Sequence, residues 1–83
     1  MIQREAVFRA GGSLTPELAA KITDLPSKFD AGLQIEYRGA RFQADSLISV
    51  LAMELYPGAR LSVLADGPEA EAAAAQLVKL LEG

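Results

Sequence analysis

The feature that most limits how this chain can fold is the strict alternation of side chains over residues 29–38. Phe, Ala, Leu, Ile and Tyr alternate there with Asp, Gly, Gln, Glu and Arg. A period of two is that of a β-strand with one buried face. Arg38-Gly39 marks a tight turn into a short strand that holds Phe42. The segment therefore predicts a half-buried β-hairpin.

The flanking segments predict two more strands and three helices. Residues 3–10 and 59–65 read as strands, with Phe8 on the inner side of the first. A helix begins at residue 15 and is expected to stop at Pro26, and a third helix spans residues 69–82. A second helix follows from residue 46, and its apolar stripe consists of Leu47, Val50, Leu51 and Leu55.

The resulting order βαββαβα places the chain in the α+β class. The economical arrangement is a four-stranded antiparallel sheet with three helices on one face, and the generic alternative is the ferredoxin-like fold. Large apolar side chains of these elements are expected to fill the layer between sheet and helices: Phe8, Ile22, Leu25, Phe29, Leu33, Ile35, Val50, Val63, Leu77, Val78 and Leu81.

Length and composition exclude several classes of function. Residues 1–83 suffice for one small domain with a single core. The chain has no cysteine and no histidine, which removes thiolate chemistry, phosphohistidine and the usual metal ligands, so we expect no metal, no cofactor and no enzymatic activity. Eight basic residues against eleven acidic ones disfavour nucleic acid. No segment is apolar enough for a membrane span, and we expect a cytoplasmic protein.

The order and length resemble the phosphocarrier protein HPr family of the bacterial phosphoenolpyruvate-dependent sugar phosphotransferase system. The likeness covers essentially the whole chain. It is carried by residues 29–35 (FDAGLQI), the turn at Gly39, residues 44–47 (ADSL), Pro57-Gly58, residues 65–67 (ADG) and residues 77–80 (LVKL). The resemblance implies the open-faced β-sandwich of that family.

The family's active-site motif, Gly-Leu-His-Thr-Arg-Pro-Ala, corresponds here to SLTPELA at residues 13–19. Thr15 occupies the place of the phosphorylated histidine, and Glu17 that of the arginine that assists the phosphoryl group. A threonine hydroxyl without a neighbouring base is a poor nucleophile, and the carboxylate of Glu17 repels phosphate. We therefore interpret Thr15-Pro16-Glu17 as a helix start, with a cap, a first-turn proline and an acid.

Ser46, behind Asp45, matches the serine that a dedicated kinase phosphorylates in many members during carbon catabolite regulation. A phosphate is favoured there by the exposed amides and the dipole of a helix N-terminus. Leu47, Ile48 and Leu51 match an apolar docking patch of the family. The resemblance thus implies a regulatory or binding module, with a serine kinase, a transcription regulator or phosphotransferase-system components as partners. It leaves open that Ser46 is only a helix cap.

Two alternatives remain at this stage. The segment ADSLISVLAMEL at residues 44–55 is similar to the Asp-Ser-Leu motif at which acyl carrier proteins receive phosphopantetheine, with Ser46 as the attachment site. Acyl carriers are helical bundles, which the period-two segments contradict. The other alternative is a degenerate paralogue that is kept only for a structural contact.

Overall fold

The computed structural model describes residues 1–9, 12 and 14–83. Within them the expected order βαββαβα is confirmed, and the α+β architecture with it. The elements are β1 (Ile2–Val7), α1 (Pro16–Lys28), β2 (Gly32–Tyr37), β3 (Ala40–Gln43), α2 (Leu47–Ala52), β4 (Arg60–Asp66) and α3 (Ala70–Glu82).

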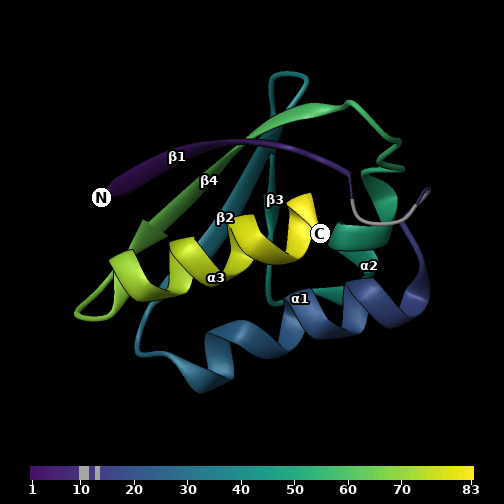
Figure 1. Ribbon diagram of the computed structural model, residues 1–83. Coiled ribbons are helices and arrows are strands. Elements are labelled where there is room, and N and C mark those ends of the chain that lie inside the picture. The colour runs from purple at the N-terminus through teal and green to yellow at the C-terminus, as the bar shows by residue number, and fades with distance from the viewer. Residues whose placement is uncertain (10–11, 13) are drawn as a thin grey trace.

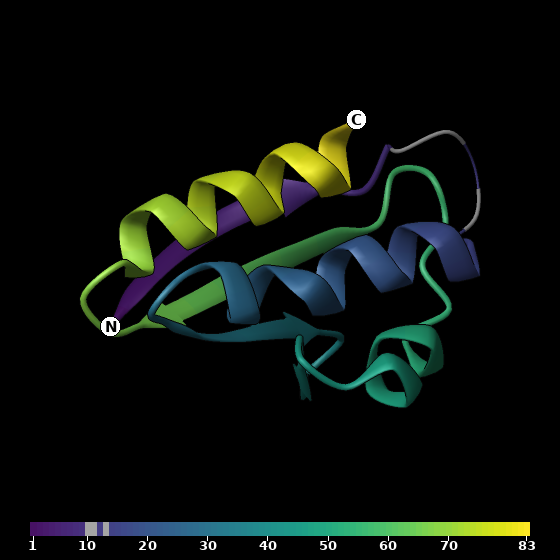
Figure 2. The same cartoon turned by 90° about the horizontal axis from the view of Figure 1, so that it is seen from below.

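The four strands form one antiparallel sheet in the order β1-β4-β2-β3. Its register places Ile35 opposite both Val63 of β4 and Phe42 of β3, so these apolar side chains share one face. The helices cover this face and leave the other open, which gives the expected open-faced β-sandwich (Figure 1). Figure 2 looks onto the helical layer, in which α3 lies along β1 and β4 while the short helix α2 follows β3 at one end.

The β2–β3 hairpin closes through the two residues that the sequence predicts. Arg38 and Gly39 have φ angles of 54° and 81°. Positive φ at both central positions is typical of a type I′ turn, whose twist matches that of the paired strands. The alternation along β2 then buries Leu33, Ile35 and Tyr37, as the period of two requires.

The boundary between α1 and β2 differs from the prediction. α1 does not stop at Pro26 but continues to Lys28. Pro26 removes only one backbone N–H donor, and a side-chain hydrogen bond and an ion pair stabilise the last turn. The Ser27 hydroxyl donates to the Asp24 carbonyl over 2.7 Å, and Lys28 pairs with the Asp24 carboxylate at 3.1 Å. Phe29 ends the helix by donating its N–H to the Leu25 carbonyl.

Three other predicted boundaries also shift. β2 starts at Gly32 rather than at residue 29, and Phe29 is half-buried. β1 ends at Val7, although the Phe8 N–H still bonds to Ala59, and Ala10 at the end of the predicted strand lies outside the described residues. α2 ends at Ala52, so Leu55 is not part of its stripe.

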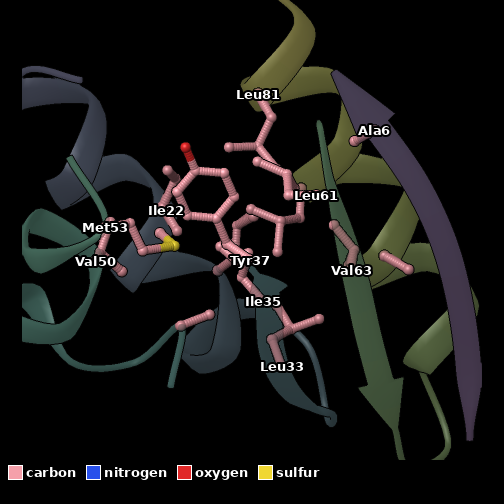
Figure 3. Packing of buried hydrophobic residues seen from close by; sticks show 14 of the residues in the cluster. Ala6, Ile22, Leu33, Ile35, Tyr37, Val50, Met53, Leu61, Val63 and Leu81 are labelled. Carbon is pink, nitrogen blue, oxygen red and sulfur yellow. The ribbon is translucent and has the colours of Figure 1, made fainter. Parts of the chain in front are cut away.

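The core lies between the sheet and the helices, and Figure 3 shows it around the Tyr37 ring. Ile22 enters from α1, Val50 from α2 and Leu81 from α3. Of the predicted core residues all are buried except Phe29 and Val78, which are half-buried and packed against the core. No charged side chain, and no polar group other than the Tyr37 phenol, is buried in the described part of the chain. Truncation of one of the large buried side chains to Ala costs about 2–5 kcal/mol.

At the end of the molecule opposite α2, two loops are held together by backbone contacts. Gly67, with φ 118°, lies so close to Asp30 that a Cβ there would be 2.9 Å from the Asp30 carbonyl oxygen. The Asp30 N–H donates to the Glu69 carboxylate over 2.8 Å, and the Glu69 N–H donates to the Asp30 carbonyl over 3.1 Å. These loops lie side by side at the left of Figures 1 and 2. We call this the closed end.

Candidate functional site

Thr15 is the N-cap of α1, as the sequence predicts. Its φ and ψ are extended, at −101° and 158°, and its hydroxyl oxygen accepts the Leu18 N–H over 3.2 Å. Pro16 follows as the first helical residue, and Glu17 lies exposed in the first turn. The hydroxyl is thus engaged in capping, and the group that follows it is anionic. These residues do what a helix start requires, and no hydrogen bond joins the Thr15 hydroxyl to a basic group among the described residues.

Ser46 caps α2 in the same way. Its hydroxyl oxygen accepts the Ser49 N–H over 3.3 Å, with an extended backbone at φ −112° and ψ 115°. The residue is half-buried, whereas Asp45 before it is exposed. A serine hydroxyl retains its proton as a donor while it accepts one bond. The position therefore combines a capping oxygen with partial access from solvent.

α2 exposes part of its apolar surface. Val50 and Met53 beyond it are buried, and Leu51 is half-buried against the core. Leu47 is 44% exposed and Ile48 83% exposed. A six-residue helix turns less than twice, so only one side of it can face the core. Of the three residues predicted for docking, Leu47 and Ile48 face outward, and Leu51 contributes mainly to packing.

The two capped helices meet at one end of the molecule. The Leu14 N–H, just before α1, donates to the carbonyl of Leu55, just after α2, over 3.3 Å. α1 and α2 pack against each other, at the right of Figures 1 and 2. Thr15 therefore lies next to the C-terminal end of α2, whereas Ser46 lies at the N-terminal end of α2. We call this the open end.

Two residues at the open end were not singled out by sequence reasoning. Glu54 has a φ of 52°, which is rare for a residue with a side chain, and it turns the chain away from α2. Tyr56 is 54% exposed and lies beside Tyr37. Burial raises the pKa of the Tyr37 phenol above its ordinary value, and the neighbouring Tyr56 raises it further. The only sequence signal for either residue was the Tyr56-Pro57-Gly58 turn.

The open end presents hydroxyl, carboxylate and apolar side chains. The sequence contains neither histidine nor cysteine, and in the part of the chain that is described no acidic residues come together as a metal site. Within the same residues, no helix is long and apolar enough to cross a bilayer. The described residues thus combine an open-faced β-sandwich with two capped helix N-termini and an exposed apolar patch.

The comparison with protein families shows which family this chain belongs to. The model described as "PTS HPr component phosphorylation site" matches residues 2–83, so the chain belongs to the PTS-HPr family. Members of this family are carrier proteins rather than enzymes. The four-stranded sheet excludes the helical bundle of acyl carrier proteins.

Individual proteins of known sequence or structure are also similar to this chain. The phosphocarrier protein HPr of Borreliella burgdorferi is 28% identical over 82 residues, which are 99% of this chain and 95% of that protein. The crystal structure of HPr from Bacillus anthracis has a TM-score of 0.89 at 21% identity, covering 96% of this chain and 95% of the other. The catabolite repression protein Crh of Bacillus subtilis, described as a domain-swapped dimer, has a TM-score of 0.76 at 20% identity, covering 99% and 94%. The two structural likenesses show the shared fold.

Proposed function

We propose that this protein is a member of the HPr family that does not carry phosphate on histidine and works as a binding or regulatory module. The observation that carries the proposal is the absence of histidine from a chain with this fold. Thr15, at the place of the family's histidine, is engaged in capping α1, and Glu17 adds a negative charge two residues later. The fold is shared by the phosphocarrier protein HPr of Bacillus anthracis and by the catabolite repression protein Crh, so a regulatory role is compatible with it.

The first experiment tests the loss of the carrier reaction. The protein is incubated with radiolabelled phosphoenolpyruvate and the first enzyme of the phosphotransferase system, beside an HPr that contains the histidine as positive control. We expect no label on this protein, because it offers neither an imidazole nor an activated hydroxyl. Acid-labile label on the protein, at any residue, would contradict the proposal.

We further propose that Ser46 is the point of regulation and that Leu47 and Ile48 contact the partner. Ser46 is half-buried and opens α2, and the two exposed apolar residues follow it directly. A phosphate on Ser46 keeps an oxygen acceptor at the helix start and gains from the helix dipole, while Asp45 opposes it by repulsion. A serine kinase, a transcription regulator and components of the phosphotransferase system are the candidate partners.

The second experiment tests this switch with an HPr serine kinase and ATP. We expect incorporation of one phosphate in the native protein and none in Ser46→Asn. Asparagine caps a helix about as well as serine, so loss of label in this variant is not a loss of structure. Ser49→Ala is the matched control, and it retains incorporation. Equal labelling of Ser46→Asn and the native protein would exclude Ser46 as the acceptor.

A further inference from the structure

Three carboxylates lie at the open end, on residues next to α2 or in the first turn of α1. Asp45 precedes α2, Glu54 follows it, and Glu17 lies in the first turn of α1, where the Leu14–Leu55 hydrogen bond joins the two helices. All three side chains belong to exposed residues. We call Leu47 and Ile48, with these three carboxylates, the acidic-rimmed patch.

None of the three carboxylates is neutralised within the described residues. The ion pairs found there join Arg4 to Glu71, Lys28 to Asp24 and Arg41 to Glu36. Lys21, one turn after Glu17 on α1, offsets part of the charge. Arg38 belongs to the β2–β3 turn, and its charge acts on the Tyr37 phenol beside Tyr56. Arg9 and Arg60 lie near the 56–58 turn, because the Phe8 N–H donates to Ala59 and the Gly58 N–H donates to Phe8. No cation among the described residues pairs with the three carboxylates, so each of them is left without an ion-pair partner there.

The open face of the sheet is different. There the Glu36 carboxylate lies 3.5 Å from the Arg41 guanidinium, and the Glu5 carboxylate accepts the Ser62 hydroxyl over 2.6 Å. Their charges are met by neighbours in the protein. Those of the acidic-rimmed patch are left for solvent or for a partner.

The negative charge of these carboxylates favours some possible partners of the patch over others. Nucleic acid and anionic lipid surfaces are repelled by it. A second copy of the chain, docked through the same patch about a two-fold axis, brings like charges together. A protein with basic side chains around an apolar recess satisfies both the exposed Ile48 and the carboxylates.

We propose that the docking surface of this protein selects a partner with a basic contact face. The inference rests on the proposed function, since it specifies the chemistry of the partner that binds at Leu47 and Ile48. Glu17 then has a positive role, because its carboxylate adds to the negative charge that such a partner meets.

The test uses two synthetic amphipathic helical peptides with the same leucine face, one carrying lysines and the other glutamates on the polar face. Binding to the full chain is measured by calorimetry and by amide shifts in NMR spectra, at low and at high salt. We expect the lysine peptide to bind about tenfold more tightly than the glutamate peptide. Its shifts should centre on Leu47 and Ile48, and its affinity should fall with salt.

Two charge-reversed proteins provide the matched comparison. In Glu17→Lys/Glu54→Lys the preference between the peptides should invert, whereas Glu71→Lys/Asp66→Lys changes the net charge equally at distant exposed positions and should keep it. Ile48→Asp should abolish binding of both peptides. Equal affinity of the two peptides, or the same inversion in both double variants, would overturn the charge inference.

The remaining outcomes separate this inference from the proposed function. If Ile48→Asp abolishes binding but the Glu17/Glu54 variant keeps the native preference, docking at α2 stands and the charge inference is wrong. If Ile48→Asp has no effect on either peptide, both are wrong. Dimers in sedimentation that disappear in Ile48→Asp, or binding to vesicles of anionic lipid, would assign the patch to another occupant and overturn the proposal. Thermal unfolding of each variant shows that it is folded.

Discussion

Residues at helix N-caps make hydrogen bonds at both ends of the molecule, but to different partners. At the closed end, the carboxylate of Glu69, the N-cap residue of α3, makes no cap bond within its own helix and instead binds the Asp30 N–H of another loop. At the open end, Ser46 and Thr15 use their oxygens on their own helices, and the side chains that follow them face solvent. A cap at the closed end joins two segments, whereas a cap at the open end only starts a helix.

The difference teaches where substitutions are tolerated. Gly67 is fixed by its φ and by the approach of Asp30, so this position of the closed end admits almost no change. Ile48, at 83% exposure, has little influence on the fold. We therefore expect substitutions at the closed end to alter stability and substitutions at the open end to alter recognition.

The largest effect is expected for Gly67→Ala. The added Cβ meets the Asp30 carbonyl oxygen at 2.9 Å, and the φ of 118° is unfavourable for alanine. Together these destabilise the protein by about 2–4 kcal/mol, measured by urea denaturation. Gly58→Ala has a similar φ of 93° but open space around the Cβ position, and its cost should be near 1 kcal/mol. Equal losses in the two variants would show that the closed end is not tightly packed.

The next effect concerns the two caps of the open end. Ser46→Ala and Thr15→Ala each remove one cap bond, and each should lower the free energy of unfolding by about 1 kcal/mol. Only Ser46→Ala should also affect labelling by the serine kinase. A loss of kinase labelling in Thr15→Ala would show that α1 takes part in the regulatory site.

Glu54→Gly should have the opposite sign. Glu54 has a left-handed backbone with a φ of 52°, which glycine adopts without steric cost, and the gain is about 0.5–1 kcal/mol after the greater freedom of the unfolded chain is included. Thermal unfolding measures it. If this variant is more stable and also binds the lysine peptide less well, Glu54 is held at the open end for recognition rather than for folding.

The smallest effect at neutral pH is expected for Tyr37→Phe. Because the folded pKa of Tyr37 is raised above the ordinary value of 10.0, the neutral phenol is the form that the fold favours. Its contribution to stability is complete below pH 10 and is lost as the pH rises through the folded pKa. Denaturation at increasing alkaline pH should show this loss in the native protein and a flatter profile in Tyr37→Phe. Identical profiles would place the Tyr37 phenol in water.

Much of the fold could be predicted because its signals are local. The alternation along β2 and the Arg38-Gly39 turn define the hairpin without other information, and Thr15 and Ser46 cap the helices that they were expected to start. The end of α1 could not be predicted in this way. Pro26 is a local stop signal, but contacts of Asp24 with Ser27 and Lys28 carry the helix past it.

The sequence predicted which residues of α2 belong to the candidate site, but not which of their side chains are exposed. A pattern of apolar residues on α2 does not say which of them face outward, because that depends on where α1 and the sheet lie. The exposure of Ile48, the half-burial of Leu51 and the left-handed Glu54 follow from tertiary packing. The rim of carboxylates could not be seen until Glu17 and Glu54, distant in sequence, were placed at the same end.

An interior without charged side chains has an evolutionary consequence. Since the described residues bury no charged side chain, they hold no buried ion pair whose two members must change together. Single substitutions can therefore change the surface while the packing of the interior is kept. This chain and the Bacillus anthracis HPr thus keep one fold at only 21% sequence identity.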